Sequence, residues 1–248
     1  MLKKRFKSTN NLIVLLDQLN IRKGDNVILH SNLGGLYQFE EKLSPEHFLK
    51  FILNYLGEKG TLLIPTYNYN FTKGEPFSRR KSKSQVGLLG NSLIKKYYKS
   101  RTIAPVFSHI VFGRLKKLIF KCDIENVFGD QSIFSILKKK NFKILCFCCS
   151  PKNITFLHFI EQQLKVNYRY NKLFHGISEK KKITIKYFVG KKHIDYSPKE
   201  KKILKLVNNK QFRETEYGRF KSYSVEANYL FKELRKKIKK RNNYIIGK

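Results

Sequence analysis

The chain has 248 residues, of which 41% are hydrophobic, so it is long enough and apolar enough to bury a substantial core. No apolar run reaches the roughly 18 residues that a membrane-spanning helix needs, and the short run at residues 12–16 is too short for a secretion signal, so we expect a soluble cytoplasmic protein. The net charge is +34, but the basic residues are spread over many segments without zinc-finger spacing, an RNP-like motif or a basic zipper, so they predict no specific nucleic-acid site.

The first half of the chain alternates between helical and extended segments. Helices are predicted over residues 11–19, 44–56 and 87–98, and the second begins with Ser44 as N-cap. Strands are predicted over residues 25–31 and 61–66. The first strand ends before Asn32-Leu-Gly-Gly35, a glycine turn of the kind at which α/β proteins place ligands. Residues 72–84 are predicted to form a long mobile loop.

The second half continues this alternation and then changes character. A short extended segment at residues 101–108 precedes a strand at 109–113, and a helix at 133–140 leads to a strand at 142–149. Residues 182–189 and 193–196, with a turn at Gly190-Lys191 between them, predict a hairpin. A helix at 199–207, a short strand at 217–223 and a basic amphipathic helix at 225–240 follow. We expect one layered α/β domain over residues 1–248, with its core at about 10–180 and a C-terminal hairpin and helix extension at about 181–248.

The four cysteines do not predict a metal site. Cys146, Cys148 and Cys149 lie in the strand predicted at residues 142–149, where Cys behaves as a small hydrophobic residue, and Cys122 stands apart. Cys146 and Cys148 share one face of that strand and Cys149 points to the other, so they form no C-x-x-C clamp. We expect no metal and a reducing compartment.

The segment Thr155-Phe-Leu-His-Phe-Ile-Glu161 holds the strongest catalytic candidates. On a helix, His158 and Glu161 lie three residues apart on one face, which places a titratable base beside a carboxylate that can orient it. For an arbitrary pair at this spacing, a satisfied histidine on a solvated face is the more common arrangement. The surrounding segments favour the catalytic interpretation.

Six segments together resemble the aminoglycoside 3-N-acetyltransferase family. They are Leu19-Asn-Ile-Arg-Lys-Gly-Asp25 with Val27-Ile-Leu-His-Ser31, Gly60-Thr-Leu-Leu-Ile-Pro-Thr66, Ser84-Gln-Val-Gly87, Arg101-Thr-Ile-Ala-Pro105 with Ser108, Phe128-Gly-Asp-Gln-Ser132, and Thr155-x-x-His158-x-x-Glu161 with Tyr168-Arg169. No single segment is decisive, but six occur in the family's order. The resemblance implies a central mixed β-sheet flanked by helices, distinct from the GNAT acetyltransferases, and transfer of an acetyl group from acetyl-CoA to an amine of a sugar.

The resemblance also implies roles for individual residues. His158 matches the family's catalytic histidine and is expected to take the proton that the attacking amine loses, a contribution of about 10²- to 10⁴-fold in rate. Glu161 is expected either to orient His158 or to contact the acceptor's ammonium group. The candidates for contacts with CoA are His30, Ser31, Thr66, Arg101 and Ser108, and those for contacts with the acceptor are Tyr67, Tyr168 and Arg169. For each of these, ordinary capping, turn or ion-pair contacts are the alternative. Because no nucleophile elbow or Cys/His constellation occurs, we expect direct transfer without a covalent intermediate.

The charge of the chain bears on the expected acceptor. An aminoglycoside is a polycation that favours an acidic cleft, and this chain has Gly90-Asn91 where drug-modifying members often carry a carboxylate. A nucleotide-linked amino sugar of surface-glycan synthesis, such as lipopolysaccharide synthesis, carries phosphates that a strongly basic protein would attract. We therefore expect a sugar nucleotide, with a true aminoglycoside-modifying enzyme as the alternative.

Two further alternatives remain at this stage. A nucleic-acid-binding protein would use the basic residues 232–241 and the aromatic side chains of Tyr217, Phe220 and Tyr223. A degenerate member of the family would bind CoA without transferring its acyl group. The sequence leaves the oligomeric state open.

Overall fold

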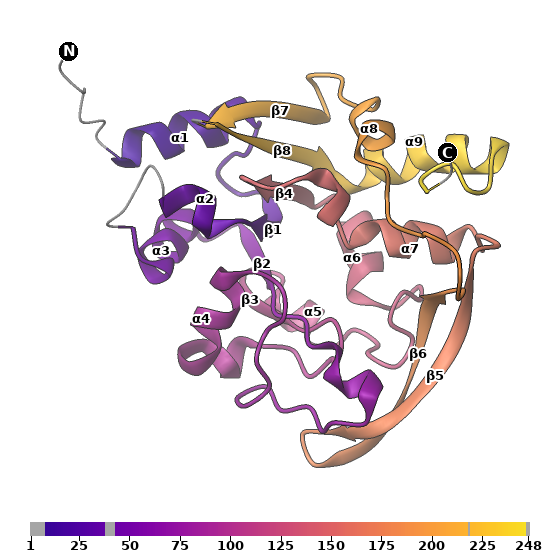
Figure 1. The fold of residues 1–248 in the computed structure, drawn as a ribbon. Coiled ribbons are helices and arrows are strands. Elements are labelled where there is room, and N and C mark those ends of the chain that lie inside the picture. Colours follow the sequence, from indigo (N-terminus) through magenta and orange to yellow (C-terminus); the bar gives the residue numbers. More distant parts are fainter. Residues whose placement is uncertain (1–7, 38–42, 218, 247–248) are drawn as a thin grey trace.

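The fold is built on a six-stranded sheet with the strand order β3-β2-β1-β4-β8-β7 (Figure 1). The computed structural model describes residues 8–37, 43–217 and 219–246, so the basic residues 1–7 lie outside the described part. Strands β1 (Asn26–Ser31), β2 (Thr61–Pro65) and β4 (Lys143–Phe147) run parallel to one another. In contrast, β3 (His109–Gly113) is antiparallel to β2, and β8 (Phe220–Glu226) is antiparallel to β4 and to β7 (Phe212–Tyr217). The central sheet is therefore mixed, as the family resemblance implied.

Helices cover both faces of the sheet because its inner strands are apolar on both faces. One face, which includes Leu29 and Phe147, packs with α1 (Ser8–Gln18), α2 (Leu33–Tyr37), α3 (Pro45–Leu56) and α4 (Leu88–Tyr97). The other face, which includes Ile28 and Ile144, packs with α5 (Lys116–Ile119), α6 (Ile133–Lys139), α7 (Phe156–Gln163), α8 (Glu200–Leu204) and α9 (Ala227–Lys240). Successive residues along a strand therefore pack into opposite cores, because side chains alternate between the two faces of a sheet.

The C-terminal region completes the central sheet. Strand β8 pairs with β4 and with β7, so the C-terminal region supplies the two strands at one side of the sheet. The basic amphipathic helix predicted near the end is α9, and its apolar residues Leu230, Leu234 and Ile238 are buried against the core. Its pattern is therefore explained by packing. Within the described ranges, no helix is both long and apolar enough to cross a membrane.

The first hairpin differs from the prediction. Strand β5 (Arg169–Ser178) pairs with β6 (Lys181–Gly190) to form a long arm (Figure 1), so the predicted pairing of residues 182–189 with 193–196 is wrong. The turn falls at Glu179 and Lys180, whose φ angles of 48° and 69° are left-handed although neither residue is glycine or asparagine. Gly190 is instead a packing position, since a Cβ there would lie 2.3 Å from the ring of Tyr196.

Three other segments also differ. The single strand predicted over residues 217–223 is two strands, β7 and β8. The glycine turn predicted after β1 is the start of the short helix α2. Strand β4 ends at Phe147, so Cys148 and Cys149 lie beyond it, and Cys148 has a left-handed φ of 52°. The helices predicted at residues 11–19, 44–56, 87–98 and 133–140 are present, and Ser44 caps α3 through a hydrogen bond from the backbone N–H of His47.

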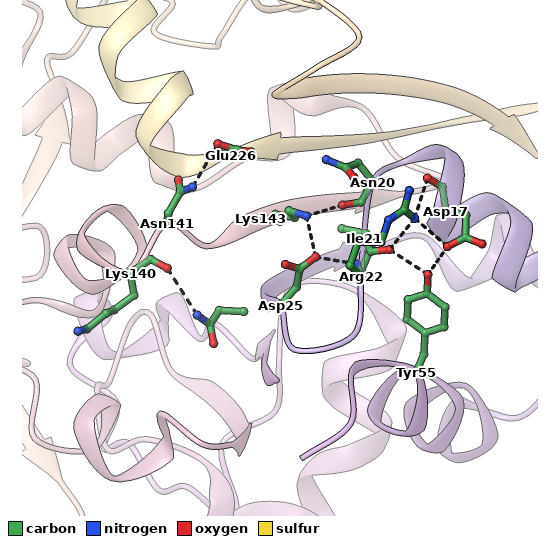
Figure 2. Close-up of polar contacts among 11 residues, drawn as sticks. Asp17, Asn20, Ile21, Arg22, Asp25, Tyr55, Lys140, Asn141, Lys143 and Glu226 are labelled. Atoms are coloured by element: carbon green, nitrogen blue, oxygen red, sulfur yellow. Dashed lines mark hydrogen bonds and ion pairs between the residues drawn. The ribbon is translucent and has the colours of Figure 1, made fainter. Parts of the chain in front are cut away.

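A polar network ties the amino-terminal ends of the parallel strands β1 and β4 together (Figure 2). The Nζ atom of Lys143 lies 2.7 Å from Oδ2 of Asp25 and also donates to the carbonyl of Asn20. The backbone N–H of Arg22 donates to the same Asp25 oxygen at 2.6 Å. Much of the motif at residues 19–25 is thus explained as the connection that fixes the start of β1.

Candidate active site

A pocket of about 770 Å³ opens at the carboxyl ends of the parallel strands β1, β2 and β4. Ligands of α/β proteins commonly bind at this edge, because the loops that leave neighbouring strands diverge there. Its walls come from the ends of β1 and β2, the segments after β1, β2 and β4, and the first turns of α4 and α7. The polar side chains among them are His30, Ser31, Asn32, Tyr67, Tyr69, Cys149, Ser150, Lys152, Asn153, Thr155 and His158.

The first turn of α4 reaches the pocket because residue 90 is a glycine. A Cβ at Gly90 would lie 2.3 Å from the carbonyl oxygen of Pro65 at the end of β2. The helix begins after Gly87, which makes no side-chain capping bond. The backbone N–H groups of this first turn have no acceptor within the helix, and residues 87–90 line the pocket, so they suit an anionic group.

His158 lies on the pocket wall, on the first turns of α7. Its Nδ1 atom is 2.8 Å from Oε2 of Glu161, which confirms that the two side chains share one helix face. A quarter of the His158 side chain is exposed, whereas Glu161 is fully buried. The imidazole therefore stands between the pocket and a carboxylate that has no access to solvent.

Two further side chains hold the Glu161 carboxylate. The hydroxyl of Tyr168 donates to Oε1 at 2.8 Å. The Nε atom of Arg169 lies 2.8 Å from Oε2 and forms an ion pair with it. The angle is not that of a hydrogen bond, so Nε has no hydrogen-bond acceptor. Burial alone would raise the pKa of Glu161, but His158, Arg169 and Tyr168 together hold that pKa below its ordinary value. The carboxylate is thus charged and can only accept hydrogen bonds.

The charged carboxylate selects the tautomer of His158. Because Glu161 only accepts, Nδ1 of the neutral imidazole must carry the proton and donate it. The Nη2 atom of Arg169, 3.0 Å from the same Nδ1, is then a second donor that adds positive charge and no hydrogen bond to the ring. The lone pair of His158 is left on Nε2, the atom available to a group in the pocket.

Three of the residues predicted to contact CoA lie elsewhere. Thr66, Arg101 and Ser108 are fully buried and do not line the pocket. The Nε atom of Arg101 lies 3.0 Å from both Thr66 Oγ1 and Ser108 Oγ. Its Nη2 atom donates to the carbonyl of Thr66 at 2.6 Å. These donors are already used within the protein, so the placement differs from the predicted contacts with CoA.

Arg101 also fixes the loop predicted to be mobile. Its Nη1 atom donates to the carbonyl oxygens of Arg79 and Ser82, at 3.0 and 2.6 Å. The ring of Phe77 stacks on the guanidinium, 4.8 Å from its Cζ atom. Burial lowers the pKa of Arg101 to about 10. The loop at residues 72–84 is irregular, as predicted, but a buried arginine binds it to β2.

The remaining predicted residues divide into two groups. His30, Ser31 and Tyr67 are among the residues that line the pocket, although Tyr67 is almost fully buried and its hydroxyl lies 3.1 Å from Nε2 of His109. Tyr168 and Arg169, predicted to contact the acceptor, are buried around Glu161 and do not line this pocket. Cys149, Lys152 and Thr155 also line the pocket but were not among the predicted ligand contacts. They lie at the end of the strand predicted at residues 142–149 or soon after it, which was a signal that they could lie at the ligand edge.

The electrostatics of the pocket favour anions. Among the described residues that line it there is no Asp or Glu, whereas Lys152 and the helix start at residues 87–90 are present. Within the part of the chain that the structure describes, no three His, Cys, Asp or Glu side chains come together as a metal site. The pocket therefore combines a partly exposed imidazole with a positive to neutral wall.

Known proteins share this architecture. A model of the family described as aminoglycoside 3-N-acetyltransferase matches residues 28–239. Among solved structures, the apoenzyme of aminoglycoside acetyltransferase AAC(3)-IVa is similar with a TM-score of 0.77 and 16% identity, over 97% of this chain and 91% of that one. AAC-IIIb in a binary complex with CoASH has a TM-score of 0.77 and 15% identity, over 95% and 97%. The YokD protein from Bacillus subtilis has a TM-score of 0.72 and 14% identity, over 93% and 98%. No curated protein matches the chain.

Proposed function

Because the chain belongs to the aminoglycoside 3-N-acetyltransferase family, we propose that it transfers an acetyl group from acetyl-CoA in the pocket to the amine of a nucleotide-linked sugar. Membership makes it an N-acetyltransferase that uses acetyl-CoA. The observation that carries the proposal is the imidazole of His158 on the pocket wall, 2.8 Å from a buried, charged Glu161.

His158 acts as the general base in this proposal. The amine attacks the thioester carbonyl, and Nε2 of His158 takes the proton that the nitrogen loses. The C–S bond of the thioester then breaks, and the CoA thiolate leaves and is protonated. A base placed in this way contributes about 10²- to 10⁴-fold to the rate.

Glu161 supports the base and does not meet the acceptor. Its carboxylate is fully buried, so an ammonium group in the pocket cannot reach it. It keeps the proton on Nδ1 and stabilises the imidazolium that forms, as the carboxylate of a catalytic triad does. Tyr168 and Arg169 hold the carboxylate in place and so act as positioning residues.

The pocket fits the chemistry of CoA. The first turn of α4 offers backbone N–H groups for a phosphate, and Lys152 adds a positive charge on the wall. His30 and Ser31 lie at the end of β1, where they can contact the uncharged arm of the cofactor. When bound, acetyl-CoA supplies the activated acetyl group.

The acceptor is proposed to be anionic because none of the described residues on the pocket wall offers a carboxylate to bind a polycation. The net charge of +34 adds long-range attraction for phosphates and repulsion for a cationic drug. A sugar that carries an amine and a nucleotide diphosphate has both the nitrogen to be acetylated and the negative charge that the protein attracts.

A panel of acceptors tests this proposal. The full chain is mixed with acetyl-CoA and a nucleotide-linked amino sugar, the same amino sugar without the nucleotide, or an aminoglycoside, and free thiol and product mass are followed. We expect the highest kcat/KM for the nucleotide-linked sugar, decreasing with added salt. A higher value for the aminoglycoside would overturn the anionic acceptor.

Variants test the role of His158 as the base separately from the identity of the acceptor. His158→Ala should lower kcat by about 10²- to 10⁴-fold. The matched control, His47→Ala, changes an exposed histidine of α3 outside the pocket and should leave kcat unchanged. If His158→Ala acetylates as fast as the wild type, His158 is not the base.

A further inference from the structure

A second pocket lies at the base of the β5–β6 arm. Its volume is about 650 Å³, and it is lined by the end of α7, the first residues of β5, the end of β6 and the loop before α6. No described residue lines both this second pocket and the pocket that contains His158. Five of its lining side chains are amides and three are cations, whereas Asp130 is the one carboxylate among the described residues that line it. Such a wall suits a polar ligand that carries negative charge.

Arg169 brings a buried guanidinium to this pocket with donors to spare. The residue is 5% exposed and lines the second pocket. Its Nε atom pairs with the charge of Glu161 but has no hydrogen-bond acceptor. Its Nη2 atom faces Nδ1 of His158, which carries its own proton, and its Nη1 atom makes a long hydrogen bond of 3.4 Å to the carbonyl of Phe188. Because a guanidinium has five N–H groups, donors remain for an anionic oxygen in the pocket.

Gln162 lacks a donor where Arg169 lacks acceptors. The Nε2 atom of Gln162 donates to Oδ1 of Asn126 at 3.1 Å, whereas its Oε1 atom is buried without a hydrogen-bond partner. Gly129 leaves room for this arrangement, because a Cβ there would lie 2.4 Å from Nδ2 of Asn126. Since buried polar atoms are nearly always paired, we expect a ligand group that donates to Oε1, such as a hydroxyl.

Tyr170 adds an apolar surface to the polar wall. It follows Arg169 in β5, lines the second pocket and is 42% exposed. An exposed aromatic ring beside amide side chains can pack against the C–H face of a sugar ring while the amides bind its hydroxyl groups. Lys165 and Lys191 lie on the same wall and attract an anionic substituent.

We propose that the second pocket binds a sugar that carries an anionic group, either a phosphate or a carboxylate. The anionic oxygens accept hydrogen bonds from Arg169, and a hydroxyl of the sugar donates to Oε1 of Gln162. A neutral sugar would leave the guanidinium without acceptors, and inorganic phosphate has no ring to pack on Tyr170. This binding site uses no step of acetyl transfer and does not rest on the proposed function.

Arg169 also connects the second pocket with His158. Its Nη2 atom lies 3.0 Å from Nδ1 of His158, so its positive charge opposes the imidazolium that forms when the base takes a proton. An anion bound to Arg169 offsets part of that charge, so occupation of the second pocket should raise kcat. This effect rests on the proposed role of His158 as the base.

Calorimetry with the full chain tests the binding site. We expect glucose 6-phosphate or glucuronic acid to bind with a Kd at least ten times lower than the Kd of glucose and of inorganic phosphate. Tighter binding of one of the two acids identifies the anionic group as a phosphate or a carboxylate. If neither acid binds, or if both bind no more tightly than glucose or inorganic phosphate, the inference is overturned.

Variants locate the bound sugar. Gln162→Leu removes the unpaired oxygen and Lys191→Ala removes a cation of the wall, and each should raise the Kd about three- to tenfold. The matched control Lys192→Ala removes an exposed charge next in sequence, outside the second pocket, and should leave the Kd unchanged. Lys152→Ala, on the wall of the first pocket, should also leave it unchanged. If Lys152→Ala weakens binding more than Lys191→Ala does, the sugar occupies the first pocket and the inference is overturned.

Acetyl-transfer assays separate this inference from the proposed function. With saturating acetyl-CoA and acceptor, the more tightly bound sugar acid should raise kcat about twofold or more, and much less in Gln162→Leu. An unchanged kcat at full occupancy would overturn the link through Arg169. If the sugar acid binds but no acceptor is acetylated, the proposed function fails and the binding site stands. If acceptors are acetylated but neither sugar acid binds, the binding site fails and the proposed function stands.

Discussion

Arg169 places its Nε atom 2.8 Å from Oε2 of Glu161, the same oxygen that contacts the imidazole of His158. This buried carboxylate keeps its charge because His158, Arg169 and Tyr168 offset the cost of burial. The site therefore depends on a group that no substrate can touch.

Glu161→Gln is the first test of that dependence. The amide can still fill the space, but it cannot favour the Nδ1–H tautomer or stabilise the imidazolium, so kcat should fall by about 10²- to 10⁴-fold with a smaller change in KM. Steady-state kinetics with acetyl-CoA and the acceptor measure both. The control Glu233→Gln changes a carboxylate of α9 outside the pocket and should leave kcat as it is. An unchanged kcat for Glu161→Gln would exclude the orienting role.

Arg101→Ala should destabilise the fold more than any exposed arginine change. The guanidinium is fully buried, and its removal leaves the carbonyl oxygens of Arg79 and Ser82 without this donor and the carbonyl of Thr66 with only that of Ser108. We expect a loss of about 3 kcal/mol in the free energy of unfolding, measured by urea denaturation. Arg80→Ala, on the exposed side of the same loop, should cost less than about 1 kcal/mol. Similar losses for the two variants would contradict the anchoring role.

The sheet strands and the contact of His158 with Glu161 were predictable because their signals are local. Apolar runs bounded by turn residues predicted β1, β2 and β4, and a spacing of three predicted the contact of His158 with Glu161. These patterns follow from helix and strand periodicity and need no knowledge of distant segments.

The residues whose position the sequence did not predict are held by contacts with segments that are distant in sequence. Arginine is rarely buried, and the partners of Arg101 in the loop at residues 72–84 are backbone carbonyls, which leave no trace in the sequence. The same holds for the hairpin turn, where Glu179 tolerates a left-handed φ while its carboxylate accepts a hydrogen bond from the backbone N–H of Arg79 at 2.6 Å. Such positions are set by tertiary structure.

Gly90→Ala tests the approach of α4 to β2. The added Cβ would lie 2.3 Å from the carbonyl oxygen of Pro65, so the first turn of α4, which lines the pocket, must move away from β2. We expect a loss of about 1–3 kcal/mol in stability, and a several-fold higher Kd for CoA in calorimetry. Gly34→Ala is the control, because its Cβ would lie 3.3 Å from one side-chain atom of Asn32 on an exposed part of α2. Equal CoA affinity in Gly90→Ala and the wild type would show that this turn is not part of the CoA site.

His109 should make the protein sensitive to acid. Its ring is fully buried, its Nε2 atom lies 3.1 Å from the hydroxyl of Tyr67, and burial lowers its pKa from 6.5 to about 3. Between these two values the unfolded chain binds a proton that the folded chain does not. The contribution of His109 to stability is therefore complete above pH 6.5 and is lost as the pH falls towards 3, by up to about 1.4 kcal/mol per pH unit.

The His109→Phe variant removes the imidazole that titrates but keeps an aromatic ring near Phe134 and Tyr67. At pH 7 the variant should be about 1 kcal/mol less stable, because the hydrogen bond to Tyr67 is lost. Urea denaturation at several pH values from 7 to 4 should show a shallower decline than in the wild type, so the difference shrinks or reverses in acid. The decline should not disappear, because burial also lowers the pKa of His30 to about 4. His47→Phe, at an exposed position, should keep the wild-type slope. An unchanged slope in His109→Phe would mean that the folded protein already accommodates a protonated His109, which a fully buried ring without a carboxylate partner should not do.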